Sequence, residues 1–113
     1  MQVIFESRDL EGAQLAELVE RRVKFVMRRL SWLVPRARVQ FSDINGPRGG
    51  VDKRCTVELK TETAGTLVTT SMARDWRSAL DAALARAVRV LVRSWRRGSV
   101  HGRTRRSALP LQD

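Results

Sequence analysis

The residues DWRSALDAALARAVRVLVRSW, numbered 75–95, have the pattern of a long amphipathic helix. Apolar side chains recur here every three or four positions, which places them on one helical face. They are Trp76, Leu80, Ala83, Leu84, Ala87, Leu91 and Trp95. Asp75 is suited to cap the first turn, and we expect the helix to end near Gly98. Such a helix must bury its stripe against another element, which predicts a layered fold.

An earlier helix is predicted over about 11–33. This segment contains no proline, and its apolar residues again keep helical spacing. They are Leu15, Val19, Val23, Val26, Leu30 and Leu33. Pro35 then ends the helix, because proline lacks the amide hydrogen that a helix interior needs.

Four short segments have the composition or alternation of strands, namely 2–6, 37–41, about 54–60 and 66–72. The turn-rich segment NGPRGG, residues 45–50, separates the second strand from the third as a hairpin loop. The order β-α-β-β-β-α predicts an α+β fold. We expect a meander of antiparallel strands that forms a four-stranded sheet with two helices packed on one face.

The chain of 113 residues is long enough for one compact domain with one core. We expect one folded domain over residues 1–97, the part that carries the helices and strands. Residues 98–113, GSVHGRTRRSALPLQD, lack apolar periodicity and are predicted to be a basic, disordered tail.

A single cysteine, Cys55, excludes an internal disulfide, and His101 alone does not complete a zinc site. The first residues, MQVIFESRD, lack the pattern of a secretory signal, and no apolar stretch is long enough to span a bilayer. We therefore expect a cytoplasmic protein without metal or other cofactor. Asp43 and Asp52 flank the hairpin loop and are predicted to stabilise its ends. Without a catalytic constellation, we do not expect an enzyme.

Basic residues outnumber acidic ones by 22 to 12, a formal charge of +10, and all but three of the bases are arginine. Such an excess favours a polyanionic partner. The bases gather opposite the apolar stripes of both helices, and no acid occurs over 21–42 or over 86–112. Like charges at helical spacing repel by a few tenths of a kcal/mol per pair, and a bound nucleic acid would cancel that repulsion. The predicted RNA contacts are Arg21, Arg22, Lys24, Arg28, Arg29, Arg86, Arg89, Arg93, Arg96 and Arg97.

Three apolar residues spaced by seven, Leu18, Phe25 and Trp32, share the basic face of the earlier helix. Two interpretations of the aromatic pair stay open. Phe25 and Trp32 either pack on sugar or base, or reach round into the core.

The order of elements and three segments resemble the ribosome hibernation promoting factor family, also described as ribosome-associated inhibitor or sigma-factor modulation proteins. The segments are MQVIFESRDLEG (1–12), ELVERRVKFVMRRLSWL (17–33) and RDWRSALDAALARAVRVLVRSW (74–95), and the resemblance covers about residues 1–97. In that family, Asp followed by two large residues and a small-small-aliphatic run opens the last helix. Here Asp75, Trp76, Ser78, Ala79 and Leu80 match this pattern, whereas Arg77 replaces the usual tyrosine.

The resemblance to the short form of this family implies a fold similar to a double-stranded-RNA-binding domain. It also implies binding in the messenger and transfer-RNA channel of the small ribosomal subunit and inhibition of translation during dormancy or stress. The ten basic residues above would then contact ribosomal RNA. A monomer with no membrane or small-molecule partner is expected. Two other functions stay open: a general module for structured RNA, and a regulatory protein that docks on an acidic partner.

Overall fold

The computed structural model describes the backbone of residues 1–44 and 51–108 and the side chains of residues 1–44 and 51–97. The expected hairpin loop at 45–50 therefore lies outside the described residues. The elements, in chain order, are β1 (Gln2–Ser7), α1 (Leu10–Ala13), α2 (Ala16–Val26), the 3-10 helix η1 (Ser31–Leu33), β2 (Arg36–Asp43), β3 (Lys53–Lys60), β4 (Thr66–Ala73) and α3 (Trp76–Ala108).

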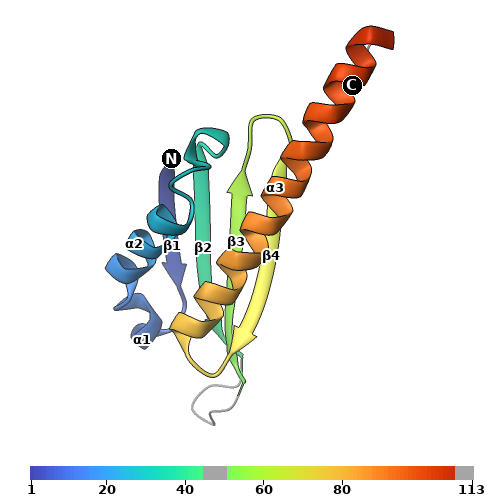
Figure 1. The fold of residues 1–113 in the computed structure, drawn as a ribbon. Coiled ribbons are helices and arrows are strands. Elements are labelled where there is room, and N and C mark those ends of the chain that lie inside the picture. Colours follow the sequence, from blue (N-terminus) through green and yellow to red (C-terminus); the bar gives the residue numbers. More distant parts are fainter. Residues whose placement is uncertain (45–50, 109–113) are drawn as a thin grey trace.

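The four strands form one sheet in the order β1-β2-β3-β4 (Figure 1). β2, β3 and β4 pair antiparallel through hairpin connections. β1 and β2 instead pair parallel, with Phe5 opposite Val39. The prediction of a purely antiparallel meander is therefore wrong for this pair. The two strands are parallel because α1 and α2 carry the chain back to the end of the sheet where β1 began, so that β2 runs in the same direction as β1.

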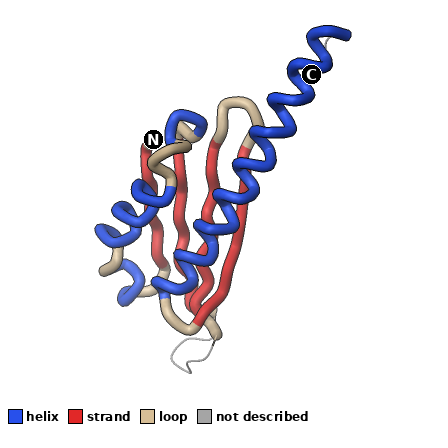
Figure 2. The backbone as a smooth tube through the Cα atoms, in the orientation of Figure 1, coloured by secondary structure: helices blue, strands red, loops and turns tan. Residues whose placement is uncertain are grey.

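Both α2 and α3 cover the same face of the sheet (Figure 2). The alternation along β2 explains this arrangement: Ala37, Val39 and Phe41 are buried, whereas the residues between them lie on the opposite, open face. β3 repeats the pattern with Cys55, Val57 and Leu59. The expected fold class, a four-stranded sheet with helices on one face, is confirmed.

The expected continuous helix over 11–33 is wrong, because the structure divides it into α1, α2 and η1. Tighter turns join the pieces. The amide of Leu15 donates to Gly12 at 3.0 Å and that of Leu30 to Met27 at 2.8 Å, each bond reaching only three residues back. Apolar residues three apart suit such turns as well as a regular helix, so their spacing could not reveal the breaks.

The expected end of the last helix near Gly98 is also wrong. α3 continues to Ala108, so the backbone over 98–108 is helical where disorder was expected. Each of the two glycines in this segment, Gly98 and Gly102, costs a helix only about 1 kcal/mol, and the first proline beyond them is Pro110. Figure 1 shows this part of α3 extending past the sheet. The start of α3 agrees with expectation, since Asp75 accepts the amide of Ser78 at 2.8 Å, a contact that lowers the pKa of Asp75.

An aromatic cluster joins the sheet to the helices. The ring of Phe41 stacks on Trp76 with centroids 4.6 Å apart, and Phe5 meets Phe41 edge to face at 5.0 Å. Gly12 of α1 lies directly beside this cluster. A Cβ at Gly12 would be 2.6 Å from the Ser7 hydroxyl and 3.1 Å from the Phe41 ring. The close approach of α1 to the sheet thus requires glycine.

We expect Gly12→Ala to lower the free energy of unfolding by about 1–3 kcal/mol, the usual cost of overpacking. Urea denaturation would measure the change. Glu11→Ala, at an exposed position on the same short helix, is the matched control and should stay within about 0.5 kcal/mol of the parent. Equal stability of the two variants would show that Ser7 and Phe41 can move aside freely.

Removing residues 98–113 should leave a cooperatively folding domain. Among the described side chains, Leu91 is the last that is fully buried, so the cut lies beyond the core. Thermal unfolding followed by circular dichroism would test this domain boundary. A broad, non-cooperative transition in the shortened chain would place the boundary further along α3.

Candidate nucleic-acid interface

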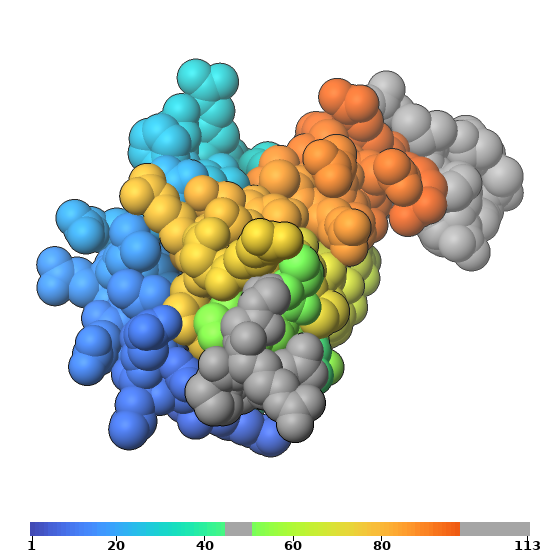
Figure 3. Space-filling model, turned by 90° about the horizontal axis from the view of Figure 1, so that it is seen from below, coloured from blue at the N-terminus to red at the C-terminus, as the bar shows by residue number. Residues whose placement is uncertain are grey.

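α2 and α3 lie side by side above the sheet, and an ion pair connects them. The Arg22 guanidinium on α2 reaches Asp81 on α3, with 3.1 Å between Nη2 and Oδ1 and 3.2 Å between Nε and the same oxygen. Seen from below, the residues of α1 and α2 (blue) pack against the start of α3 (yellow) (Figure 3). The two basic helices therefore present neighbouring surfaces, as the sequence predicted.

The five bases around α2 have different surroundings. Arg22 is half-buried against Asp81, and Lys24 pairs with Glu20 at 2.9 Å. Arg28 donates to the carbonyl of Phe25 at 2.7 Å and lies 4.3 Å from the centre of its ring. Arg21 and Arg29 are exposed, and neither forms an ion pair with any described residue. Acids from outside the segment 21–42 thus neutralise two of the five bases.

The five arginines of α3 that were predicted to contact RNA are all exposed: Arg86, Arg89, Arg93, Arg96 and Arg97. Arg86 donates to the carbonyl of Thr70 on β4 at 2.9 Å and so lies on the flank of α3 away from α2. The other four form no ion pair within the described part of the chain, and we call them the arginine stripe: Arg89, Arg93, Arg96 and Arg97. The stripe is therefore the largest uncompensated charge on the helices.

Three aromatic side chains are exposed near these bases. Phe25, Trp32 and Trp95 have 56%, 65% and 43% of their surface accessible. These values exclude one of the two interpretations of Phe25 and Trp32, namely that their rings reach round into the core. Trp95 was expected in the buried stripe of α3, and that prediction is wrong. It lies one turn beyond Leu91, the last fully buried side chain among the described residues of α3.

The open face of the sheet carries further bases that the sequence reading did not single out. Arg38 pairs with Glu6 at 2.7 Å, and the amide of Gln40 donates to the same carboxylate at 2.8 Å. These contacts, that of Gln40 first, lower the pKa of Glu6. Arg36 and Arg54 are exposed on this face without an ion pair to a described residue. Strand alternation predicts that they face away from the helices, but charge alone does not distinguish the two sides of the sheet.

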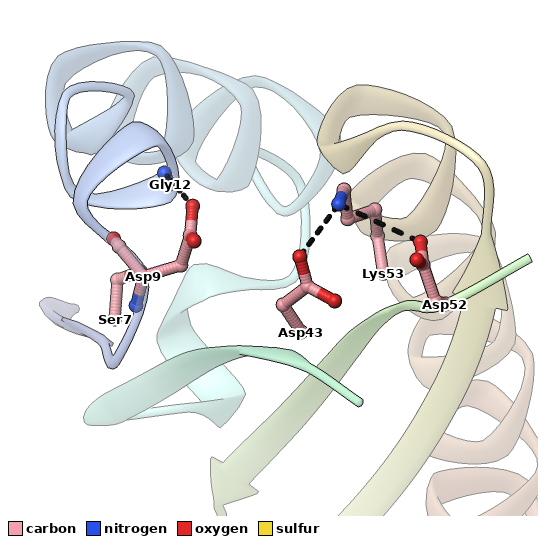
Figure 4. Close-up of polar contacts among 6 residues, drawn as sticks. All are labelled: Ser7, Asp9, Gly12, Asp43, Asp52 and Lys53. Carbon is pink, nitrogen blue, oxygen red and sulfur yellow. Dashed lines mark hydrogen bonds and ion pairs between the residues drawn. The ribbon is translucent and has the colours of Figure 1, made fainter. Parts of the chain in front are cut away.

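A polar cluster closes the lower end of the sheet (Figure 4). Lys53 lies 2.7 Å from Asp43 and 3.5 Å from the fully buried Asp52. The hydrogen bond that Lys53 donates to Asp43 is the main cause of the raised pKa of Lys53. The ammonium also lies 5.6 Å from the centre of the Trp76 ring. Asp43 thus stabilises the base of the hairpin through Lys53, a partner that the sequence reading missed. The buried carboxylate of Asp52 contacts the same ammonium but accepts no hydrogen bond from a described residue.

Two further kinds of site, a metal site and a reactive cysteine, can be checked in the described residues. They contain no group of three or more His, Cys, Asp or Glu side chains arranged to hold a metal ion. Cys55 is buried in β3, and desolvation raises the pKa of its thiol from 9.0 to about 12. The thiol is therefore protonated at neutral pH and a poor nucleophile.

Within the described ranges, no helix combines the length and the apolar character that a membrane span requires.

Comparison with known proteins places the fold. No family model and no curated protein matches the sequence. Among solved structures, the chain is similar to a ribosomal subunit interface protein from Coxiella burnetii, with a TM-score of 0.61 and 15% sequence identity. The similarity covers 82% of this chain and 96% of the other. At this identity the comparison shows a shared fold: the chain has the fold of a ribosomal subunit interface protein.

Proposed function

We propose that this chain is a ribosome-associated, non-enzymatic protein that binds RNA of the small ribosomal subunit and inhibits translation during dormancy or stress. The arginine stripe carries the proposal, because Arg89, Arg93, Arg96 and Arg97 are exposed on one helix without an acidic partner among the described residues. The fold shared with a ribosomal subunit interface protein supports the choice of partner. A cytoplasmic location follows from that partner.

The arrangement suits contact with phosphate. Each guanidinium offers several donors in a fixed plane and can bind a phosphate in two places. α3 holds these groups at spacings of four, three and one residues, so neighbouring side chains repel until an anion lies between them. Phosphate contacts of this kind read backbone geometry and carry no base identity. We therefore expect recognition by the shape of the folded RNA.

The bases of α2 have a secondary role in this proposal. Arg21 and Arg29 are free to meet phosphate directly. Arg22 and Lys24 must first exchange Asp81 and Glu20 for the RNA, although exposed ion pairs of this kind contribute only about 0–1 kcal/mol each. Arg28 and Arg86, which bind backbone carbonyls, add positive charge at the two flanks.

Replacing Arg89, Arg93 and Arg96 together by Gln should weaken binding to purified small subunits while leaving the fold intact. Each lost phosphate contact reduces the slope of log affinity against log salt by roughly 0.7–0.9, so three contacts reduce it by roughly two to three. Fluorescence anisotropy across a salt series would measure both quantities. Circular dichroism would establish that the variant is folded.

The matched control replaces Arg36, Arg54 and Lys60 by Gln, which removes the same charge from the open face of the sheet. This variant should retain most of the affinity and the slope. Equal losses in both variants would mean that net charge alone drives binding. A lower affinity with an unchanged slope would favour an acidic protein partner, and equal affinity of the parent for any RNA duplex would favour a general RNA-binding module. Translation assays with added protein would test inhibition directly.

A further inference from the structure

The aromatic residues of this chain separate into a core group and a surface group. Phe5, Phe41 and Trp76 pack on one another beneath the helices. The remaining three lie on the helical side with roughly half of their surface exposed: Phe25, Trp32 and Trp95. None of the surface group belongs to the buried core or to the partly buried residues that pack against it.

Two members of the surface group touch each other. Trp32 follows α2 in η1 and Trp95 lies on α3, and their rings meet edge to face with centroids 6.3 Å apart and planes at 87°. The indole N–H of Trp32 donates to the carbonyl of Arg29 at 3.2 Å. This bond satisfies the one polar atom of the ring, so the exposed part of Trp32 is hydrocarbon. We call Trp32 and Trp95 the aromatic platform.

The edge-to-face geometry leaves ring surface uncovered. In such a pair one ring uses an edge and the other uses one face, so at least three of the four ring faces are not covered by the partner. The exposure of 65% for Trp32 agrees with this geometry. A flat ligand can therefore lie on the platform without displacing either side chain.

The charges beside the platform indicate which flat ligand this is. Arg28 and Arg29 precede Trp32 by four and three residues, and Arg96 and Arg97 directly follow Trp95. All four guanidinium groups are exposed, and none forms an ion pair with a described residue. An apolar protein partner would have to leave these charges without counter-ions. A nucleotide brings a phosphate and a flat ring together.

We propose that the aromatic platform is a stacking site for an unpaired nucleobase, with the adjacent arginines binding the phosphates on either side of it. The inference rests on the proposed function and adds a class of ligand to it. Stacking accepts any base, because every base has a flat face. The platform therefore distinguishes unpaired from paired nucleotides and leaves base identity unread.

A pair of model RNAs tests the inference. One is a perfect hairpin duplex and the other is the same duplex with a single bulged adenosine. The full-length parent should prefer the bulged RNA, and Trp32→Ala with Trp95→Ala should remove this preference, weakening binding to the bulged RNA by roughly 5- to 150-fold. The salt slope should stay unchanged, because no phosphate contact is lost. Trp32→Phe should retain most of the preference.

Two controls accompany these variants. Leu10→Ala removes an apolar side chain that is 86% exposed on α1, away from the platform, and should leave both affinities unchanged. Tryptophan emission provides a second measurement, since the bulged RNA should quench the parent. The variant with both platform residues changed to Phe keeps only the buried Trp76 as a fluorophore and should not be quenched.

Loss of the preference in the double-alanine variant, together with quenching of the parent that is absent from the double-phenylalanine variant, would support the site. A parent that binds both RNAs equally, or a folded double-alanine variant that keeps the preference, would overturn it. In either case binding to small subunits that depends on the arginine stripe would leave the proposed function standing. A parent that prefers the bulged RNA and ignores small subunits would support the platform and refute the ribosomal function.

Discussion

The stacking of Trp76 on Phe41, with ring centroids 4.6 Å apart, is the contact on which the arrangement of the helices depends. It joins the first turn of α3 to the end of β2, an inner strand of the sheet, and thereby sets the rotation of α3 about its axis. With Trp76, Leu80, Leu84 and Leu91 buried, the positions on the far side of the helix must face solvent. The same contact limits the space available to α1, which approaches it through Gly12. The direction of the arginine stripe thus follows from packing in the core.

The two helices differ in how their charge is balanced. The positive charge of α2 is partly balanced by Glu20 on the same helix and by Asp81 on α3. The contact between Arg22 and Asp81 also holds α2 beside α3. On α3 most arginines have no such partner within the described residues. The free energy available from an approaching polyanion is therefore greatest along α3, because no existing ion pair has to be broken there.

The sequence predicted the element order, the core face of each strand and the cap at Asp75, since these depend on local periodicity and side-chain chemistry. It failed where the outcome depends on how distant segments meet. The parallel pairing of β1 follows from the length of the connection to β2. The breaks around α2 share the spacing of a regular helix, and Trp95 keeps the spacing of the buried stripe although it lies one turn beyond Leu91 and is exposed. For the interface, the sequence identified the bases, but Asp81 and Glu20 became visible as their partners only in the folded chain.

The parallel pairing of β1 with β2 has a consequence for how the chain is made. β2, β3 and β4 join through short connections, so each can pair with its neighbour soon after both have left the ribosome. β1 is synthesised before the other three strands, yet its partner strand β2 ends at Asp43. Until then the apolar residues of β1 and of the helices after it have no sheet to cover. The amino-terminal third of the protein must therefore wait during synthesis, and it is the segment most exposed to mispairing or to capture by a chaperone in that interval.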